Sequence, residues 1–70
     1  MKIYIKGDFI QLNKLLKYAG IISTGGEAKF FIEDNDIKLN GNSVYELRKK
    51  IRVGDNLTIN NNCITIFEEK

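Results

Sequence analysis

The sequence predicts an α+β fold in which two short crossed helices pack on a small, mostly antiparallel sheet. Three observations support this prediction. The chain begins with alternating polar and apolar residues, continues through two segments of helical spacing, and ends in short alternating runs separated by turn residues. With 70 residues, the chain can support one hydrophobic core, so we expect residues 1–70 to form a single domain.

The first strand is predicted from alternation. Lys2–Lys6 places Ile3 and Ile5 on one face and polar or aromatic side chains on the other. Gly7 and Asp8 then end the strand.

The first helix is predicted from apolar residues at helical spacing, namely Leu12, Leu15, Leu16 and Ala19. Gly20 follows at the position of a left-handed C-terminal cap. Lys14, Lys17 and Tyr18 share another face of the same helix, where they are free to meet a partner.

A second helix is expected to begin at Thr24. Thr24–Glu27 fits a capping box, in which the hydroxyl accepts from a backbone amide and Glu27 reaches back. Its predicted apolar face consists of Ala28, Phe31 and Ile32. We expect Asn35 to end it, because asparagine tolerates positive φ. With few residues between them, the two helices must cross sharply.

Turn residues define the rest of the sheet. Ile37 and Leu39 alternate into Asn40-Gly41, a hairpin sequence that would set Ile37 opposite Val44. Gly54-Asp55 predicts another turn.

Asn61-Asn62 predicts a second two-residue hairpin loop. The resulting register pairs Thr58 with Thr65, Ile59 with Ile64, and Leu57 with Ile66. Each pair is chemically matched, which favours this register over a slip of one residue.

Composition argues against catalysis and for an intracellular protein. The chain has no histidine, the commonest general base and metal ligand, and its single cysteine, Cys63, fits a reducing cytoplasm and a small core or edge position. The carboxylates Glu33, Asp34 and Asp36 are expected on the solvated surface. We therefore predict no enzymatic activity, no cofactor and no metal. No apolar run approaches the roughly 20 residues of a membrane helix, so no membrane contact is expected.

Charge is distributed unevenly along the chain. Residues 1–52 hold ten Lys/Arg and six Asp/Glu, a net charge of +4, whereas residues 53–70 hold one Lys and three Asp/Glu, a net charge of −2. This asymmetry is typical of a protein that meets a polyanion.

Two features could recognise phosphate. Gly25-Gly26 opens the second helix, where absent side chains let an anion approach the amides; alternatively, a tight corner between the helices requires glycine for steric reasons. Basic residues also lie beside aromatics: Lys14, Lys17, Tyr18, Lys29 and Phe30 on the helices, and Arg48, Lys49, Lys50 and Arg52 before the Gly54-Asp55 turn. Phe30 lies off the apolar stripe and either packs or stacks on a base, and packing is the expected outcome.

These motifs together resemble the RNA-binding domain of ribosomal protein S-four, also called the alpha-L RNA-binding motif. The matching residues are Ser23-Thr24, Ala28, Phe31-Ile32, Ile37–Gly41, Val44 and Val53–Asp55. Leu12–Gly20, Thr24–Lys29 and Lys49–Asp55 are similar to a stand-alone bacterial branch, the YaaA/YbcJ-like small proteins. The likeness covers about residues 10–59. Many family members carry an arginine directly after the serine/threonine position, where this chain has Gly25.

The resemblance implies a non-catalytic module for structured, rRNA-like RNA, bound through phosphate and shape contacts. The residues it places on the RNA backbone are Lys14, Lys17, Ser23, Thr24, Gly25, Gly26, Lys29, Arg48, Lys49, Lys50 and Arg52. The resemblance points to a bacterial protein associated with the ribosome or its assembly. We also expect a cytoplasmic location, from the single cysteine, and a monomer. The alternative is a protein–protein adaptor that adds a partner strand at an exposed sheet edge, either Lys2–Lys6 or Asn62–Phe67. We do not expect a sulfur-carrier function, because the sequence ends Phe-Glu-Glu-Lys and lacks a terminal Gly-Gly.

Overall fold

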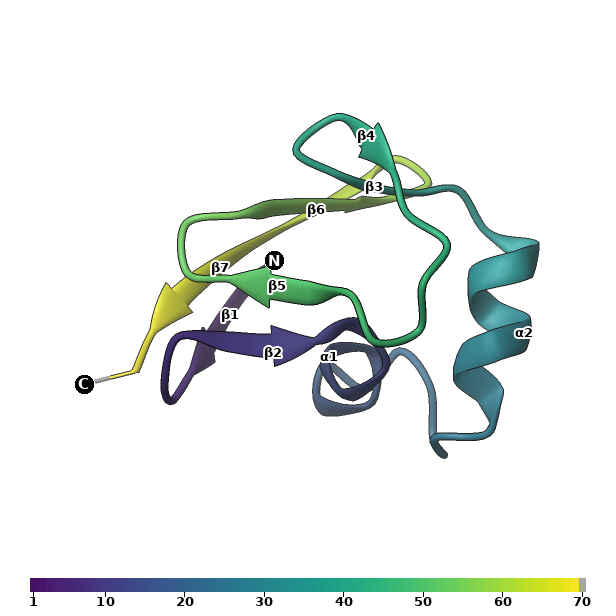
Figure 1. The fold of residues 1–70 in the computed structure, drawn as a ribbon, viewed down its shortest axis with the longest axis horizontal. Helices are drawn as coiled ribbons and strands as arrows, with labels where there is room; N and C mark the ends of the chain where they lie inside the picture. Colours follow the sequence, from purple (N-terminus) through teal and green to yellow (C-terminus); the bar gives the residue numbers. More distant parts are fainter. Residues whose placement is uncertain (70) are drawn as a thin grey trace.

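A computed structural model describes residues 1–69 of the chain. Two helices and seven strands follow one another along it (Figure 1). In chain order they are β1 (Lys2–Ile5), β2 (Phe9–Gln11), α1 (Leu12–Tyr18), α2 (Glu27–Asp34), β3 (Ile37–Leu39), β4 (Asn42–Ser43), β5 (Lys50–Arg52), β6 (Asn56–Ile59) and β7 (Asn62–Glu68). The predicted α+β class is confirmed.

The strands form two sheets. The larger has the order β1-β7-β6-β3-β4, and the smaller pairs β2 with β5. β1 runs parallel to β7, whereas every other pair is antiparallel, so the sheet is mixed. In Figure 1, α1 is seen down its axis below β2 and α2 lies in the plane at one end, so the two helices cross steeply as predicted.

One apolar core holds these elements together. Its fully buried large side chains come from α1 and from three strands: Leu12, Leu15, Leu16, Ile51, Leu57 and Ile66. Ile3 and Ile5 are also buried, which confirms the inward face predicted for the first strand. Gly20 has a φ of +77°, which confirms the left-handed residue expected after the first helix.

α2 begins three residues later than expected, at Glu27 instead of Thr24. Residues 24–27 form a turn in which the Glu27 amide donates to the Thr24 carbonyl at 3.2 Å. Only half of the predicted capping box is present. The Glu27 carboxylate accepts from the amide of Thr24 at 3.1 Å, but the Thr24 hydroxyl donates to this carboxylate instead of accepting from an amide.

Asn35 ends α2 as predicted, although by a different mechanism. Its φ is −128°, which is extended backbone and not the left-handed conformation expected for it. The side chain caps the helix instead, because its Nδ2 donates to the Phe31 carbonyl at 2.9 Å. Asparagine is therefore useful here for its amide, not for its tolerance of positive φ.

The first hairpin has the predicted register. Asn40 and Gly41 have φ values of 51° and 89°, as a two-residue turn between twisted strands requires. The Val44 amide donates to the Ile37 carbonyl at 2.9 Å, so these residues lie opposite each other as expected.

The register predicted for the second hairpin is wrong. The turn lies at Asn60-Asn61, and the strands pair Leu57 with Ile64 and Ile59 with Asn62. A shift of two residues returns every side chain to the same face, so apolar patterning does not distinguish the two registers. Long-range bonds of Asn60 decide it: its side chain contacts Asn35 and Asp36, and φ is 56°.

Two further expectations are corrected. Asn62–Phe67 is not a sheet edge, because β7 lies between β1 and β6. Phe30 does not pack, since 65% of its surface is exposed. Phe30 faces solvent because α2 buries only Ala28 and Ile32, one narrow stripe of this short helix.

Candidate nucleic-acid interface

The loop before β5 is attached to the first turn of α1. The amide of Leu12 donates to the Lys49 carbonyl at 2.8 Å, and the amide of Asn13 donates to the Leu47 carbonyl at 2.9 Å. The N-cap residue, Gln11, makes no side-chain cap bond, so the two loop carbonyls satisfy the first two amides of the helix, and the Asn13 side chain accepts from the next one, of Lys14, at 3.0 Å. The basic loop is thereby held against the helix turn that carries Lys14.

β5 orients two of the predicted basic residues outward. Ile51 is fully buried, so its neighbours Lys50 and Arg52 project from the opposite face of the strand. Pairing with β2 sets Lys50 opposite Gln11 and Arg52 opposite Phe9. The last three residues of the predicted basic segment, Lys50–Arg52, therefore form a strand with one buried and two exposed positions, whereas Arg48 and Lys49 lie in the preceding loop.

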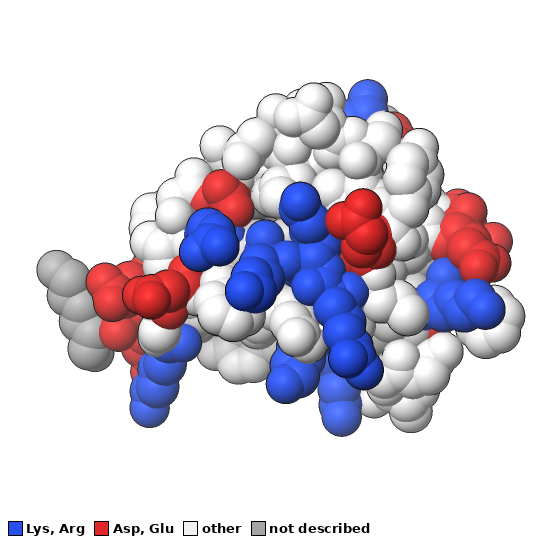
Figure 2. Space-filling view, in the orientation of Figure 1, with Lys and Arg blue, Asp and Glu red and all other residues white. Residues whose placement is uncertain are grey.

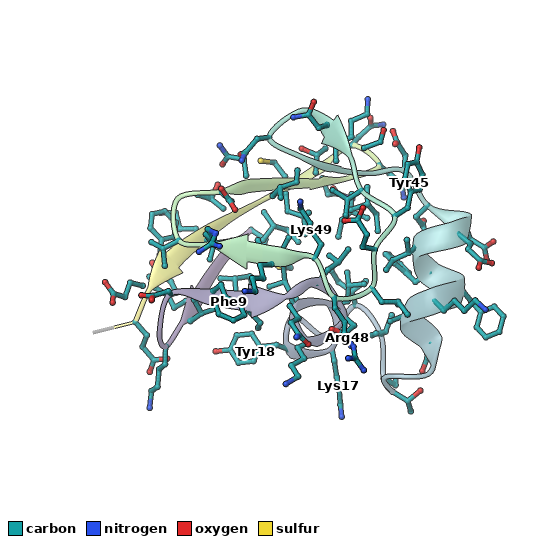
Figure 3. The ribbon with its side chains drawn as sticks, viewed as in Figure 1. Phe9, Lys17, Tyr18, Tyr45, Arg48 and Lys49 are labelled. Atoms are coloured by element: carbon teal, nitrogen blue, oxygen red, sulfur yellow. The ribbon has the colours of Figure 1, made fainter. Side chains whose placement is uncertain are left out.

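We use the name cationic strip for the exposed basic residues of α1, β5 and the loop between β4 and β5, namely Lys14, Lys17, Arg48, Lys49, Lys50 and Arg52. Figure 2 shows Lys and Arg gathered across the middle of this face, over β5 and α1. In Figure 3, Lys49, Arg48 and Lys17 follow one another from β5 toward the far side of α1. The structure thus brings six of the predicted site residues onto one face.

The positive charge of the strip is not neutralised internally. Within residues 1–69, the ion pair whose charged atoms lie within 4.0 Å of each other is that of Lys38 Nζ with Asp36 Oδ2, at 3.9 Å. This pair lies outside the strip. The four cations of residues 48–52 line an open groove of about 410 Å³, together with the single carboxylate of Glu46. Exposed cations without carboxylate partners create a positive field that attracts an anion.

Lys29 lies apart from this strip, on α2. That helix also carries Glu27, Glu33 and Asp34, so its net charge is negative. Figure 2 shows acidic and basic side chains mixed at this end of the molecule. The structure therefore does not place Lys29 in the continuous positive surface.

The Ser23–Gly26 corner connects the two helices and is exposed throughout. Its amides at Ser23 and Thr24 donate to one oxygen of the Glu27 carboxylate, at 3.3 and 3.1 Å. An internal carboxylate thus occupies part of the position expected for a phosphate. A phosphate would have to approach Gly25 and Gly26 instead.

Steric crowding does not explain the two glycines. A Cβ at Gly25 would meet no atom within 4 Å, and one at Gly26 would meet only the Thr24 hydroxyl, at 4.0 Å. Gly26 has ordinary helical angles, with φ of −67° and ψ of −22°. The explanation that Gly25 and Gly26 are required by a tight corner between the helices is therefore wrong.

Sequence reasoning missed the aromatic residues that accompany the strip. Phe9 lies on β2, and the Lys50 ammonium is 4.8 Å from the centre of its ring. Tyr45 is 76% exposed, and Figure 3 shows it on the same face as Lys49. The alternation of polar and apolar residues in Lys50–Arg52 could have predicted the strand β5. It could not have predicted that this strand pairs with Phe9–Gln11, because the two segments are far apart in the sequence.

Other kinds of site find little support among the described residues. Cys63 was expected at a core or an edge position, and both expectations are wrong. Its side chain is exposed, and its strand, β7, is an inner strand of the sheet. Within residues 1–69 there is no group of three or more side chains that could hold a metal ion. None of the helices described is long and apolar enough to span a membrane.

Comparison with family models agrees with this geometry. A model described as "S4 domain" matches residues 3–67, nearly the whole chain. The chain therefore belongs to the S4 domain family, and the resemblance to the ribosomal S-four type of domain is confirmed at that level. S4 domains are generally RNA-binding modules without enzymatic activity. No curated protein matches the chain.

Proposed function

We propose that this protein is a non-catalytic RNA-binding module that recognises structured, rRNA-like RNA through phosphate and shape contacts. The observation that supports this most strongly is the cationic strip, in which six exposed basic side chains from α1, β5 and the preceding loop share one face. Family membership supports the same class of partner.

Electrostatics favours the RNA backbone as the ligand of the strip. Lysine and arginine side chains that neutralise phosphates release condensed counterions, and this release supplies most of the affinity of such surfaces. The deep major groove of an RNA helix is closed to side chains, so its recognition relies on backbone and shape. A strip of exposed cations on a rigid strand and helix suits that kind of contact.

The Ser23–Gly26 corner and Lys29 form a second part of the proposed site. Gly25 and Gly26 have open space where a side chain would be, so an RNA backbone can approach their main chain closely. The Glu27 carboxylate limits this approach at Ser23 and Thr24. We therefore assign the corner a secondary role beside the strip.

The cellular setting is part of the proposal. We expect a cytoplasmic monomer that belongs to the stand-alone bacterial branch and associates with ribosomal RNA or assembling ribosomes. A protein–protein adaptor using the β1 edge is the competing function. Pull-down from a nuclease-treated lysate separates them, because partners that persist after RNA digestion favour the adaptor.

The direct test is a titration of a labelled ribosomal RNA fragment at several salt concentrations. We expect the affinity to fall steeply as salt rises, with a log–log slope proportional to the number of phosphates contacted. Binding that does not change with salt, or absence of binding to structured RNA, contradicts the proposal.

A charge-reversed double variant locates the site. Lys49→Glu with Lys50→Glu changes the charge of the strip by four units and should abolish RNA binding while the fold persists, because both side chains are exposed. The matched control is Lys2→Glu with Lys38→Glu, which makes the same change in net charge outside the strip. Equal loss in both variants would mean that net charge, not the strip, governs binding.

A further inference from the structure

A small pocket opens between β1, β2 and α1, beside the cationic strip. It has a volume of about 320 Å³, and six of its lining residues are Tyr4, Ile5, Lys6, Phe9, Ile10 and Tyr18. Three of these are aromatic, each with more than a third of its surface exposed. The volume lies at the lower end of the range of about 300–1,000 Å³ for small-molecule sites, which suits one planar ring system.

The aromatic walls of the pocket are held by their neighbours. The Tyr18 hydroxyl donates to the Tyr4 carbonyl at 3.2 Å, which ties α1 to β1. The Tyr4 ring stacks on Phe67, with ring centres 5.5 Å apart and an angle of 27° between the planes. Such contacts fix side-chain orientations before a ligand arrives, which lowers the entropic cost of binding.

The pocket is continuous with the cationic strip through Phe9. The Lys50 ammonium lies 4.8 Å from the centre of the Phe9 ring, and Arg52 is paired opposite Phe9 on the neighbouring strand. In Figure 3, Phe9 and Tyr18 lie next to each other, on the face that carries Lys17, Arg48 and Lys49. A ligand that fills this pocket therefore also meets the strip.

We propose that the pocket binds an unpaired base of the RNA, stacked against Phe9 and Tyr18, while the flanking phosphates lie along the cationic strip. This inference rests on the proposed RNA-binding function and specifies the RNA: a structured molecule with a bulged or looped-out nucleotide. Single-stranded bases stack on exposed aromatic rings with little dependence on sequence, because every base has a π-face.

The charges at the pocket favour a base over a phosphate inside it. Glu69 also lines the pocket, and its carboxylate repels a phosphate but can accept hydrogen bonds from the N–H groups of a base. Lys6, on the same pocket wall, and Lys50, over Phe9, are available to the phosphates outside. A nucleotide combines the flat apolar ring and the negative charge that this arrangement requires.

The test compares two RNA hairpins that are identical except for one bulged 2-aminopurine, whose fluorescence falls when it stacks. We expect the full-length protein to bind the bulged hairpin about tenfold more tightly than the fully paired one, and to quench its fluorescence. Phe9→Leu and Tyr18→Leu each keep an apolar side chain but remove the ring. Either variant should lose the preference for the bulged hairpin and the quenching, while still binding the paired hairpin.

Tyr45→Leu is the matched control, because Tyr45 is an exposed aromatic residue on the same face that does not line the pocket. It should retain both the preference and the quenching. Binding of both hairpins with equal affinity and no quenching overturns the pocket proposal and leaves the proposed function intact. Failure to bind either hairpin overturns both. Occupation of the pocket by a proline-rich peptide without any effect of the bulge also overturns it.

Discussion

The main-chain amide of Leu12 donates a hydrogen bond of 2.8 Å to the main-chain carbonyl of Lys49. This bond joins the first residue of α1 to the loop before β5, across 37 positions of the chain. Together with the bond from Asn13 to Leu47, it supplies the main-chain cap of this helix, whose N-cap residue Gln11 makes no side-chain cap bond. The same contact that completes the helix therefore assembles the cationic strip.

Single lysine substitutions should show which side chains of the cationic strip contact RNA, through the salt dependence of the RNA affinity. Lys14→Ala and Lys49→Ala should each reduce the slope of log affinity against log salt by about one, because each removes one phosphate contact. Lys38→Ala should leave the slope unchanged, because Lys38 pairs with Asp36 outside the strip. Filter binding or fluorescence anisotropy across a salt series measures all three. A reduced slope for Lys38→Ala would contradict the location of the site.

A substitution in the Ser23–Gly26 corner should affect the stability of the fold and the affinity for RNA differently. Gly26→Ala is compatible with the observed φ of −67° and meets only the Thr24 hydroxyl at 4.0 Å. The free energy of unfolding should therefore stay constant or rise by about 0.4–1 kcal/mol, because alanine restricts the unfolded chain.

RNA affinity of the same Gly26→Ala variant should fall if the backbone of the corner meets a phosphate. Urea unfolding and RNA titration on one protein preparation separate the two effects. Unchanged affinity would remove the corner from the proposed site while the cationic strip remains. A loss of stability would contradict the open space observed around Gly26.

The register of the second hairpin is testable through its asparagines. Asn60→Ala should lower the free energy of unfolding by about 2 kcal/mol, because it removes the side-chain bonds to Asn35 and Asp36 and places alanine, which tolerates the left-handed conformation less well than asparagine, at a φ of 56°. Asn61→Ala, at the neighbouring exposed turn position, should change stability much less. A larger effect for Asn61 than for Asn60 would argue against the observed register.

Ile51 should be a major contributor to stability. Its side chain is fully buried between the exposed Lys50 and Arg52, so Ile51→Ala should cost about 2–5 kcal/mol and Ile51→Val about 0.5–1.5 kcal/mol. Val53→Ala is the control, because Val53 is 42% exposed. Equilibrium unfolding in urea measures each. A cost for Ile51→Ala no larger than that for Val53→Ala would show that β5 is not anchored by its core residue.

Local signals were sufficient for much of the fold. Alternation gave the inward face of Ile3 and Ile5, and positive φ at Asn40 and Gly41 follows directly from the chemistry of that turn. The second hairpin was not predictable in this way. Two registers that differ by two residues present identical faces to the core, and Asn60 selects one through contacts with residues more than twenty positions away.

The candidate site, too, could be predicted only in part from the sequence. Sequence identified the basic residues, but not that six of them share one face while Lys29 lies on an acidic helix. It also did not reveal Phe9 as a partner of Lys50, because this contact requires the pairing of β2 with β5.

The sequence by itself determined the α+β class, the inward faces, the first hairpin and the family, because periodicity, turn chemistry and motif order act over a few residues. Only the tertiary structure decided where the cations gather, which asparagines turn the last hairpin, and that an aromatic pocket lies beside the strip. These features depend on main-chain bonds and side-chain contacts between segments 14 or more residues apart, such as Tyr4 with Tyr18 and Leu12 with Lys49, for which local patterning carries no information.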